Sequence, residues 1–149
     1  MHSRSLNNRG AALVEFAIVS LLLITLMLGV IEFGLLMKDY LTLSQSAREG
    51  SRSASLGSPT SVVQARVLNS APTLTVASIV ISMQKRPAGG SWSALGNSAD
   101  GLSNDALAGD QVQVSLTYPH VLITGSFFSW LAGGGNSISI HTQMIMRRE

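Results

Sequence analysis

The feature that most limits how this chain folds is an apolar stretch near its N-terminus, from Ala11 to Met37. Apart from Glu15, Glu32 and a few Ser, Thr and Gly residues, every side chain in it is apolar. As a helix rising about 1.5 Å per residue it spans about 40 Å, more than the ~30 Å of a bilayer core. The stretch predicts a membrane-spanning helix over residues 11–37.

A secretory signal peptide is the alternative interpretation, with Arg4 and Arg9 as its basic region. The apolar run is too long for that, and no small-x-small cleavage site follows Met37. The uncharged part, residues 16–31, reaches only about 24 Å, so one glutamate is expected at or near membrane depth. A charge there costs about 2.5–3.5 kcal/mol and usually has a partner or a function.

Composition excludes several classes of partner and cofactor. The net charge is +2, but two of the ten basic residues, Arg4 and Arg9, precede the span, and the other eight balance the eight acidic residues. No basic face is left for nucleic acid, so no nucleic-acid partner is expected. The chain has no cysteine, which excludes disulfides and cysteine-ligated metals, and no cofactor is predicted.

The start of the span carries a recognisable pattern. A short basic leader ends in Gly10, and the apolar helix has Glu15 at the fifth position after it and Phe16 at the sixth. This resembles the processing site of type IV prepilins and pseudopilins. The resemblance implies a cytoplasmic leader, residues 1–10, that a prepilin peptidase cuts between Gly10 and Ala11.

The same resemblance implies an assembly role for the Glu15 carboxylate, which in such proteins pairs with the freed N-terminal amine of a neighbouring subunit. Two opposite charges in a low-dielectric setting gain most when they neutralise each other. The alternative is an ordinary anchor with a glutamate near the membrane interface.

Three further stretches resemble the TadE-like proteins of the tight-adherence (Flp-type) pilus system. They are Val30–Gly34, which contains E-F-G, Ala47–Arg52, and the C-terminal Met144–Glu149. The second departs from the usual A-R-E-G-A-R only at Ser51. The family implies a single-pass inner-membrane protein with residues 38–149 in the periplasm, and other pilins or pseudopilins and inner-membrane assembly proteins as partners. TadF- and TadG-like proteins share the N-terminal signature, so the subtype stays open.

Glu32 is a second candidate assembly residue. It follows Glu15 by 17 residues, or about 260° around a helix after whole turns, so the two carboxylates face different sides. Three interpretations remain open for Glu32: pairing with Lys38, pairing with a neighbouring subunit, or plain solvation at the periplasmic interface.

Beyond the membrane the patterns predict an α+β domain, in the coarse architecture of a pseudopilin. The first helix should continue and pack on the domain's own sheet along a stripe of shrinking residues, Tyr40, Leu43, Ala47, Gly50 and Ala54. A second helix should start with Ser58 as N-cap and Pro59 at its first position and stop at Pro72. It presents one apolar face: Val63, Val67, Leu68 and Ala71.

Three strand signals follow, so an antiparallel sheet of three or four strands is expected. Residues 73–84 are rich in Val and Ile, and residues 111–118 and 137–146 alternate apolar with polar side chains. Residues 86–110, rich in Gly, Ser, Ala and Asn, predict a long exposed loop between the first two strands. The most apolar later segment, residues 121–131, is either a linker folded over the sheet or a patch for a partner or the membrane surface.

The sequence gives little support for a metal site or a catalytic site. Oxygen ligands suited to calcium occur in the loop, but not at EF-hand spacing, and they are ordinary turn residues: Asp100, Asn104, Asp105 and Asp110. Gly133–Gly135 lacks the Lys and Ser/Thr of a phosphate-binding loop. No histidine, His2, His120 or His141, has a carboxylate or nucleophile at a recognisable motif spacing.

Two functional hypotheses result, and neither is an enzyme. The first is a minor pilin or pseudopilin that takes part in pilus assembly after leader cleavage. The second is an uncleaved, membrane-anchored periplasmic scaffold or binding protein of the same machine.

Overall fold

The computed structural model describes residues 9–125, 129 and 133–149 of the chain. Its elements are α1 (Arg9–Ser55), α2 (Thr60–Asn69), a short 3-10 helix η1 (Val76–Ser78), and the strands β1 (Val80–Arg86), β2 (Ser93–Ala94), β3 (Gln111–Val121) and β4 (Ser137–Arg147). The chain divides into two compact units, Met1–Leu35 and Leu36–Glu149. The predicted α+β class is confirmed.

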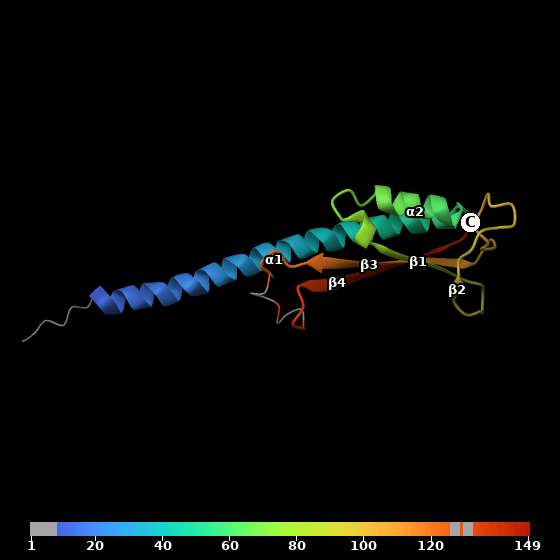
Figure 1. Ribbon diagram of the computed structural model, residues 1–149. Helices are drawn as coiled ribbons and strands as arrows, with labels where there is room; N and C mark the ends of the chain where they lie inside the picture. Colours follow the sequence, from blue (N-terminus) through green and yellow to red (C-terminus); the bar gives the residue numbers. More distant parts are fainter. Residues whose placement is uncertain (1–8, 126–128, 130–132) are drawn as a thin grey trace, which may run out of the picture. The chain divides into compact units, whose positions relative to one another are not determined.

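The helix α1 runs unbroken through the predicted span and its continuation (Figure 1). No proline or turn signal interrupts it before Gly57. There the backbone enters the left-handed region (φ 87°), which glycine adopts at little cost. The Gly57 and Ser58 amides donate back to the Ala54 and Ser53 carbonyls, at 3.0 and 3.2 Å, and so close the last turn in a Schellman motif.

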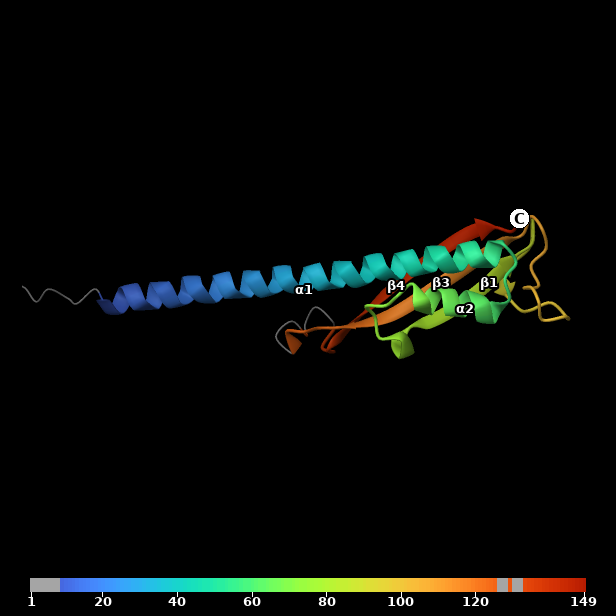
Figure 2. The same cartoon turned by 90° about the horizontal axis from the view of Figure 1, so that it is seen from above.

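The second unit is a four-stranded antiparallel sheet covered on one face by helices. The strand order is β2-β1-β3-β4, with β3 paired along its whole length to β4. Figure 2 shows α2 and the C-terminal part of α1 lying over the same face of this sheet. The alternation predicted for β3 is confirmed, because its helix-facing side chains Val112, Val114, Leu116 and Tyr118 are buried.

The small-residue stripe of α1 packs as predicted, with one exception. Leu43, Ala47 and Ala54 are fully buried, and a Cβ on Gly50 would run into Val67 of α2 as well as lie 3.4 Å from Val114 of β3. A larger residue at Gly50 would therefore push α1 away from both α2 and the sheet. Tyr40, expected on this stripe, is 42% exposed instead.

Two predicted element boundaries are wrong. The strand expected over residues 73–84 begins only at Val80, because the residues before it form a turn after Pro72 and then η1. The helix α2 begins at Thr60, and Pro59 rather than Ser58 is its N-cap, with no side-chain hydrogen bond at the cap. The Thr60 amide is satisfied from outside the helix, by Asn97 Oδ1 at 2.8 Å. The predicted apolar face of α2 is correct, since Val63, Val67 and Ala71 are buried and Leu68 packs against them.

The loop between β1 and β3 is less exposed than predicted. It contains β2, which pairs with β1, and a bridge between Asn97 and Asn104. Leu95, Asn104 and Ala106 are all at least nine-tenths buried. Asn104 explains much of this, because its Nδ2 donates to the Ala54 carbonyl at 2.7 Å and to the Ser58 carbonyl at 3.0 Å. One buried amide thus fastens the loop to the end of α1.

Candidate functional site

The predicted processing site lies in the first turns of α1. Gly10, Ala11, Glu15 and Phe16 are all helical and exposed, while leader residues 1–8 fall outside the described residues. A Cβ placed on Gly10 would meet nothing within 4 Å. Glycine is a weak helix former, by up to about 1 kcal/mol relative to alanine, and no close contact with the described residues offsets that cost. Packing among the described residues therefore does not explain a glycine at this position.

The helix around this site presents apolar side chains that no other part of the described chain covers. Between Leu13 and Ile31 the large apolar side chains are mostly more than half exposed, and Phe16 reaches 70%. This is the one helix, in the part of the chain that the structure describes, that is long and apolar enough to cross a membrane. Such a surface is costly in water and suits a bilayer, where lipid tails cover it.

The two glutamates of the span differ in their surroundings. Glu15 is exposed, and its carboxylate has no hydrogen bond or ion pair with any described residue. Glu32 is only 7% exposed, so a freely solvated Glu32 does not agree with the structure. The Lys38 ammonium, one of the partners considered for it, lies 3.5 Å from Asp39 Oδ1. Their different burial accords with the two carboxylates facing different sides of the helix.

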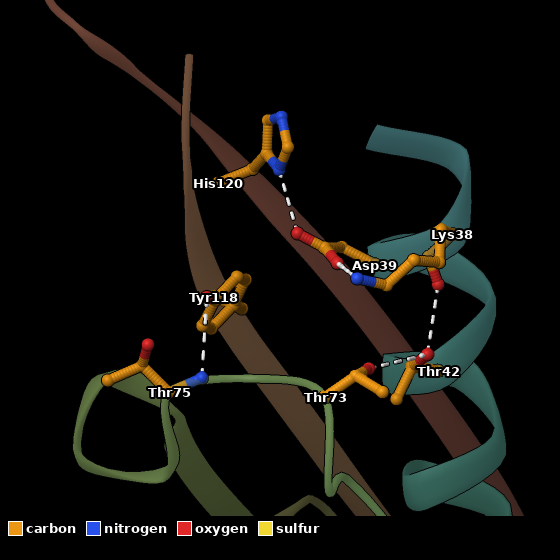
Figure 3. Close-up of polar contacts among 7 residues, drawn as sticks. All are labelled: Lys38, Asp39, Thr42, Thr73, Thr75, Tyr118 and His120. Atoms are coloured by element: carbon orange, nitrogen blue, oxygen red, sulfur yellow. Dashed lines mark hydrogen bonds and ion pairs between the residues drawn. The ribbon is translucent and has the colours of Figure 1, made fainter. Parts of the chain in front are cut away.

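A buried hydrogen bond missing from the sequence interpretation joins α1 to β3. His120 Nδ1 lies 2.8 Å from Asp39 Oδ2, and the two side chains are 4% and 13% exposed. Figure 3 shows them pointing toward each other from the strand and the helix. The imidazole is shut off from solvent, so the arrangement suits a structural contact better than a catalytic one. Neither residue has a motif around it, and the two lie 81 positions apart, so no sequence pattern indicated this contact.

Weaker polar contacts surround this pair and tie the same part of α1 to its neighbours (Figure 3). The Thr42 hydroxyl lies 3.5 Å from the Thr73 hydroxyl, and the Thr75 amide lies 3.5 Å from the Tyr118 hydroxyl. The helix is thus fixed where the second unit begins, at both the sheet and the turn that follows α2.

The order along α1 is now complete: an exposed glycine, an exposed carboxylate five residues later, an uncovered apolar surface, and a small-residue face packed on a sheet. Residues 10–52 match the family model of the TadE-like proteins. The resemblance stated from the sequence is confirmed over that segment. No curated protein and no solved structure matches the chain significantly.

The TadE-like segment ends at Arg52, and the structure separates its last residues by burial. Ala47 and Ser51 are fully buried, and the Ser51 hydroxyl donates to the Met144 carbonyl of β4 at 3.0 Å. Arg48, Glu49 and Arg52 point to solvent. Packing explains the small residues of Ala47–Arg52. It does not explain the charged residues of the same stretch, which point to solvent.

Outside the TadE-like segment, the four oxygen-bearing loop residues serve local structure. Asp105 binds Lys85 Nζ at 2.8 Å and the Gly96 amide at 2.8 Å. Asp110 accepts the Leu107 amide, Asp100 accepts the Leu102 amide, and Asn104 fastens the loop to α1. Among the described residues no three His, Cys, Asp or Glu side chains come together as a metal would need.

The apolar segment 121–131 falls partly outside the described residues, at 126–128 and 130–132. Of the remainder, Leu122 is 3% exposed and its amide donates to the Asn136 carbonyl at 2.9 Å, whereas Ile123 is 71% exposed. Leu122 is thus buried, as the linker interpretation predicts, and Ile123 is exposed, as the exposed-patch interpretation predicts.

Proposed function

We propose that this protein is a minor pilin or pseudopilin of a tight-adherence (Flp-type) pilus and acts in pilus assembly after its leader is removed. The match of residues 10–52 to the TadE-like family supports the connection with such a pilus. Its partners would be a prepilin peptidase, other pilins or pseudopilins, and inner-membrane assembly proteins.

The observation that carries the proposal is the Glu15 carboxylate. It projects from an apolar helix that nothing in the described chain covers, and it has no partner among the described residues. A carboxylate held in that way within a membrane gains by meeting a cation from another molecule. The α-amine of Ala11, once freed by cleavage after Gly10, is a cation at the right end of the helix in a neighbouring subunit.

The experiment that tests the proposal is mass spectrometry of the intact protein purified from membranes. Cleavage after Gly10 would leave a 139-residue chain beginning at Ala11, from 149 minus 10 residues. A bulky replacement of Gly10 should leave the uncut mass, and because a Cβ at Gly10 would meet none of the described residues within 4 Å, the fold should survive that change. Recovery of intact residues 1–10 while the peptidase is active would favour the uncleaved scaffold instead.

The proposal also sets the orientation, with the N-terminus cytoplasmic and residues 38–149 in the periplasm. Two Lys or Arg residues precede the span and three follow within fifteen residues, so the positive-inside rule does not decide. The leader's processing at the cytoplasmic face would decide it. An enzyme active only in the periplasm, joined after Glu149 through a spacer, should be active, and a stable but inactive fusion would contradict both orientation and processing.

A further inference from the structure

Two of the charged residues at the end of the TadE-like segment, Glu49 and Arg52, border a hollow between α1 and α2. It has a volume of about 280 Å³ and is lined by Glu49, Arg52, Ser53, Leu56, Ser58 and Arg66. Leu56, on its wall, is 57% exposed. The Arg52 and Arg66 side chains form no hydrogen bond or ion pair with the described residues. Two guanidinium groups, one carboxylate and an exposed leucine make this hollow, the Arg52–Arg66 pocket, suited to a carboxylate beside an apolar side chain.

A second feature of the same unit is an exposed carboxylate beside an exposed apolar side chain. At the tip of the loop between β2 and β3, Leu102 is 78% exposed, more than any other large apolar side chain described. Asp100 stands beside it, and Asp100 Oδ1 accepts the Leu102 amide at 3.0 Å and the Ser98 hydroxyl. These bonds, the Ser98 bond first, lower the pKa of Asp100, so it is ionised at neutral pH.

The loop tip is held in shape before any partner arrives. The Ser98 amide donates to the Ser103 carbonyl at 2.9 Å, and Gly101 turns the chain in the left-handed region at φ 70°. Asn97 and Asn104 close the base of the loop. A preorganised tip loses little conformational entropy on binding, which favours its use as a contact.

We propose that the loop tip of one copy, Asp100 and Leu102, docks into the Arg52–Arg66 pocket of a second copy. The carboxylate would meet the two guanidinium groups while Leu102 covers Leu56. The complementarity extends to charge, since the tip is acidic and the pocket has one more cation than anion. The proposed occupant of the pocket is therefore the loop tip of a second copy of this chain.

The position of the two features permits a two-fold arrangement. The base of the loop bonds to the segment that also borders the pocket, through Asn104 to the Ser58 carbonyl and Asn97 to the Thr60 amide. Tip and pocket therefore lie at the same end of the second unit, and a symmetric pair can seat both tips at once. A contact this small is weak between free molecules, but two chains anchored in one membrane meet at a raised effective concentration.

The inference goes beyond the proposed function, because pairing through the loop requires neither leader cleavage nor Glu15. It is tested with the whole chain in lipid vesicles, with the leader intact. Failure of the pairing would leave the processing result untouched, and failure of processing would leave the pairing result untouched.

The absence of cysteine in the chain allows a cross-linking experiment without background. A Leu56→Cys copy and a Leu102→Cys copy, carrying tags of different size, are reconstituted together and oxidised. We expect the mixed disulfide to form at least about tenfold faster than with Leu107→Cys in place of Leu102→Cys. Leu107 is 74% exposed in the same loop but away from the tip, so it measures random collision. Equal rates for the two mixtures would overturn the proposal.

A matched pair of charge reversals provides the second test. Arg52→Glu, in the pocket, should slow the mixed disulfide by about tenfold, since it replaces a charge-assisted contact with repulsion. Arg48→Glu, also exposed on α1 but not part of the pocket, should leave the rate unchanged. Circular dichroism of both variants verifies the fold. Equal effects of the two reversals, or no effect of Arg52→Glu, would overturn the proposal. Pairing of the purified protein only with a different, acidic protein would overturn it as well.

Discussion

His120 Nδ1 lies 2.8 Å from Asp39 Oδ2, so a buried hydrogen bond joins the end of β3 to the part of α1 where the second unit begins. Burying polar groups costs desolvation energy, and the bond offsets that cost only while both partners are present. The losses from removing the two partners are therefore expected to be less than additive.

The first prediction follows from that pair. His120→Ala removes the imidazole bonded to Asp39 Oδ2 and leaves that carboxylate with the Lys38 ammonium 3.5 Å away. It should lower the free energy of unfolding by about 1–3 kcal/mol. The double variant Asp39→Asn/His120→Ala should lose less than the sum of the single variants. His141→Ala, at an exposed histidine bonded to Thr117, is the control and should change stability by under about 0.5 kcal/mol. Urea unfolding of the whole chain in detergent measures all four, and equal losses at His120 and His141 would contradict the assignment.

The second prediction compares two helical glycines. Gly50→Ala places a Cβ against Val67 and should destabilise the second unit by about 1–3 kcal/mol through overpacking. Gly34→Ala meets nothing within 4 Å, so it should be neutral or stabilise the helix by up to about 1 kcal/mol. Thermal melts followed by circular dichroism distinguish the two. A Gly50→Ala variant as stable as Gly34→Ala would mean that α1 does not pack as closely as described.

The third prediction concerns acid stability. Burial raises the pKa of Asp105, but the hydrogen bonds from Lys85 and the Gly96 amide outweigh it, and the net pKa is lowered. A carboxyl whose pKa is lower in the folded chain stabilises fully above its unfolded value of about 3.9 and loses that contribution as pH falls through the folded value. Asp105→Asn should therefore destabilise at pH 7 and progressively less below pH ~4. Urea midpoints at several pH values test this, and a constant difference between the two proteins would refute it.

The fourth prediction concerns Glu15. If the carboxylate serves assembly rather than processing, as proposed, Glu15→Leu and Glu15→Gln should still be cut after Gly10, yet fail to support pili. Membrane insertion should not suffer, since removing the charge relieves a cost of a few kcal/mol. Glu15→Asp keeps the charge with a shorter reach and should give partial piliation. Electron microscopy of pili and immunoblots of the mature chain measure these effects, and normal piliation with Glu15→Leu at native protein level would remove the assembly role.

Local periodicity was enough to predict much of this fold. The alternation that identified β3 and β4 arises because one face of each strand is buried by the helices. The stripe on α1 is the helix side of the same buried contact and consists of Leu43, Ala47, Gly50 and Ala54. Ser58 misled the prediction of α2, since the Thr60 amide is satisfied by Asn97 from a distant loop. No residue near Ser58 in the sequence indicates that contact with Asn97.

The parts of the site that escaped prediction share one physical cause. Asp39 and His120 have no recognisable local motif, and these residues, 81 positions apart, come into contact only when the chain folds. The Arg52–Arg66 pocket likewise joins side chains from two helices. By contrast, Gly10, Glu15 and Phe16 lie within one short stretch of chain, so their pattern was visible in the sequence alone.

The bond from Ser51 to the Met144 carbonyl has a consequence for how the protein is made, because these residues are 93 positions apart. The packing face of α1 leaves the ribosome before the strand that completes its cover. At about 5–20 residues per second, that face waits roughly 5–20 s for β4. During this interval the newly made helix exposes Leu43 and its small neighbours to chaperones and proteases. A chain that stalls before β4 should therefore be more readily degraded than the complete chain.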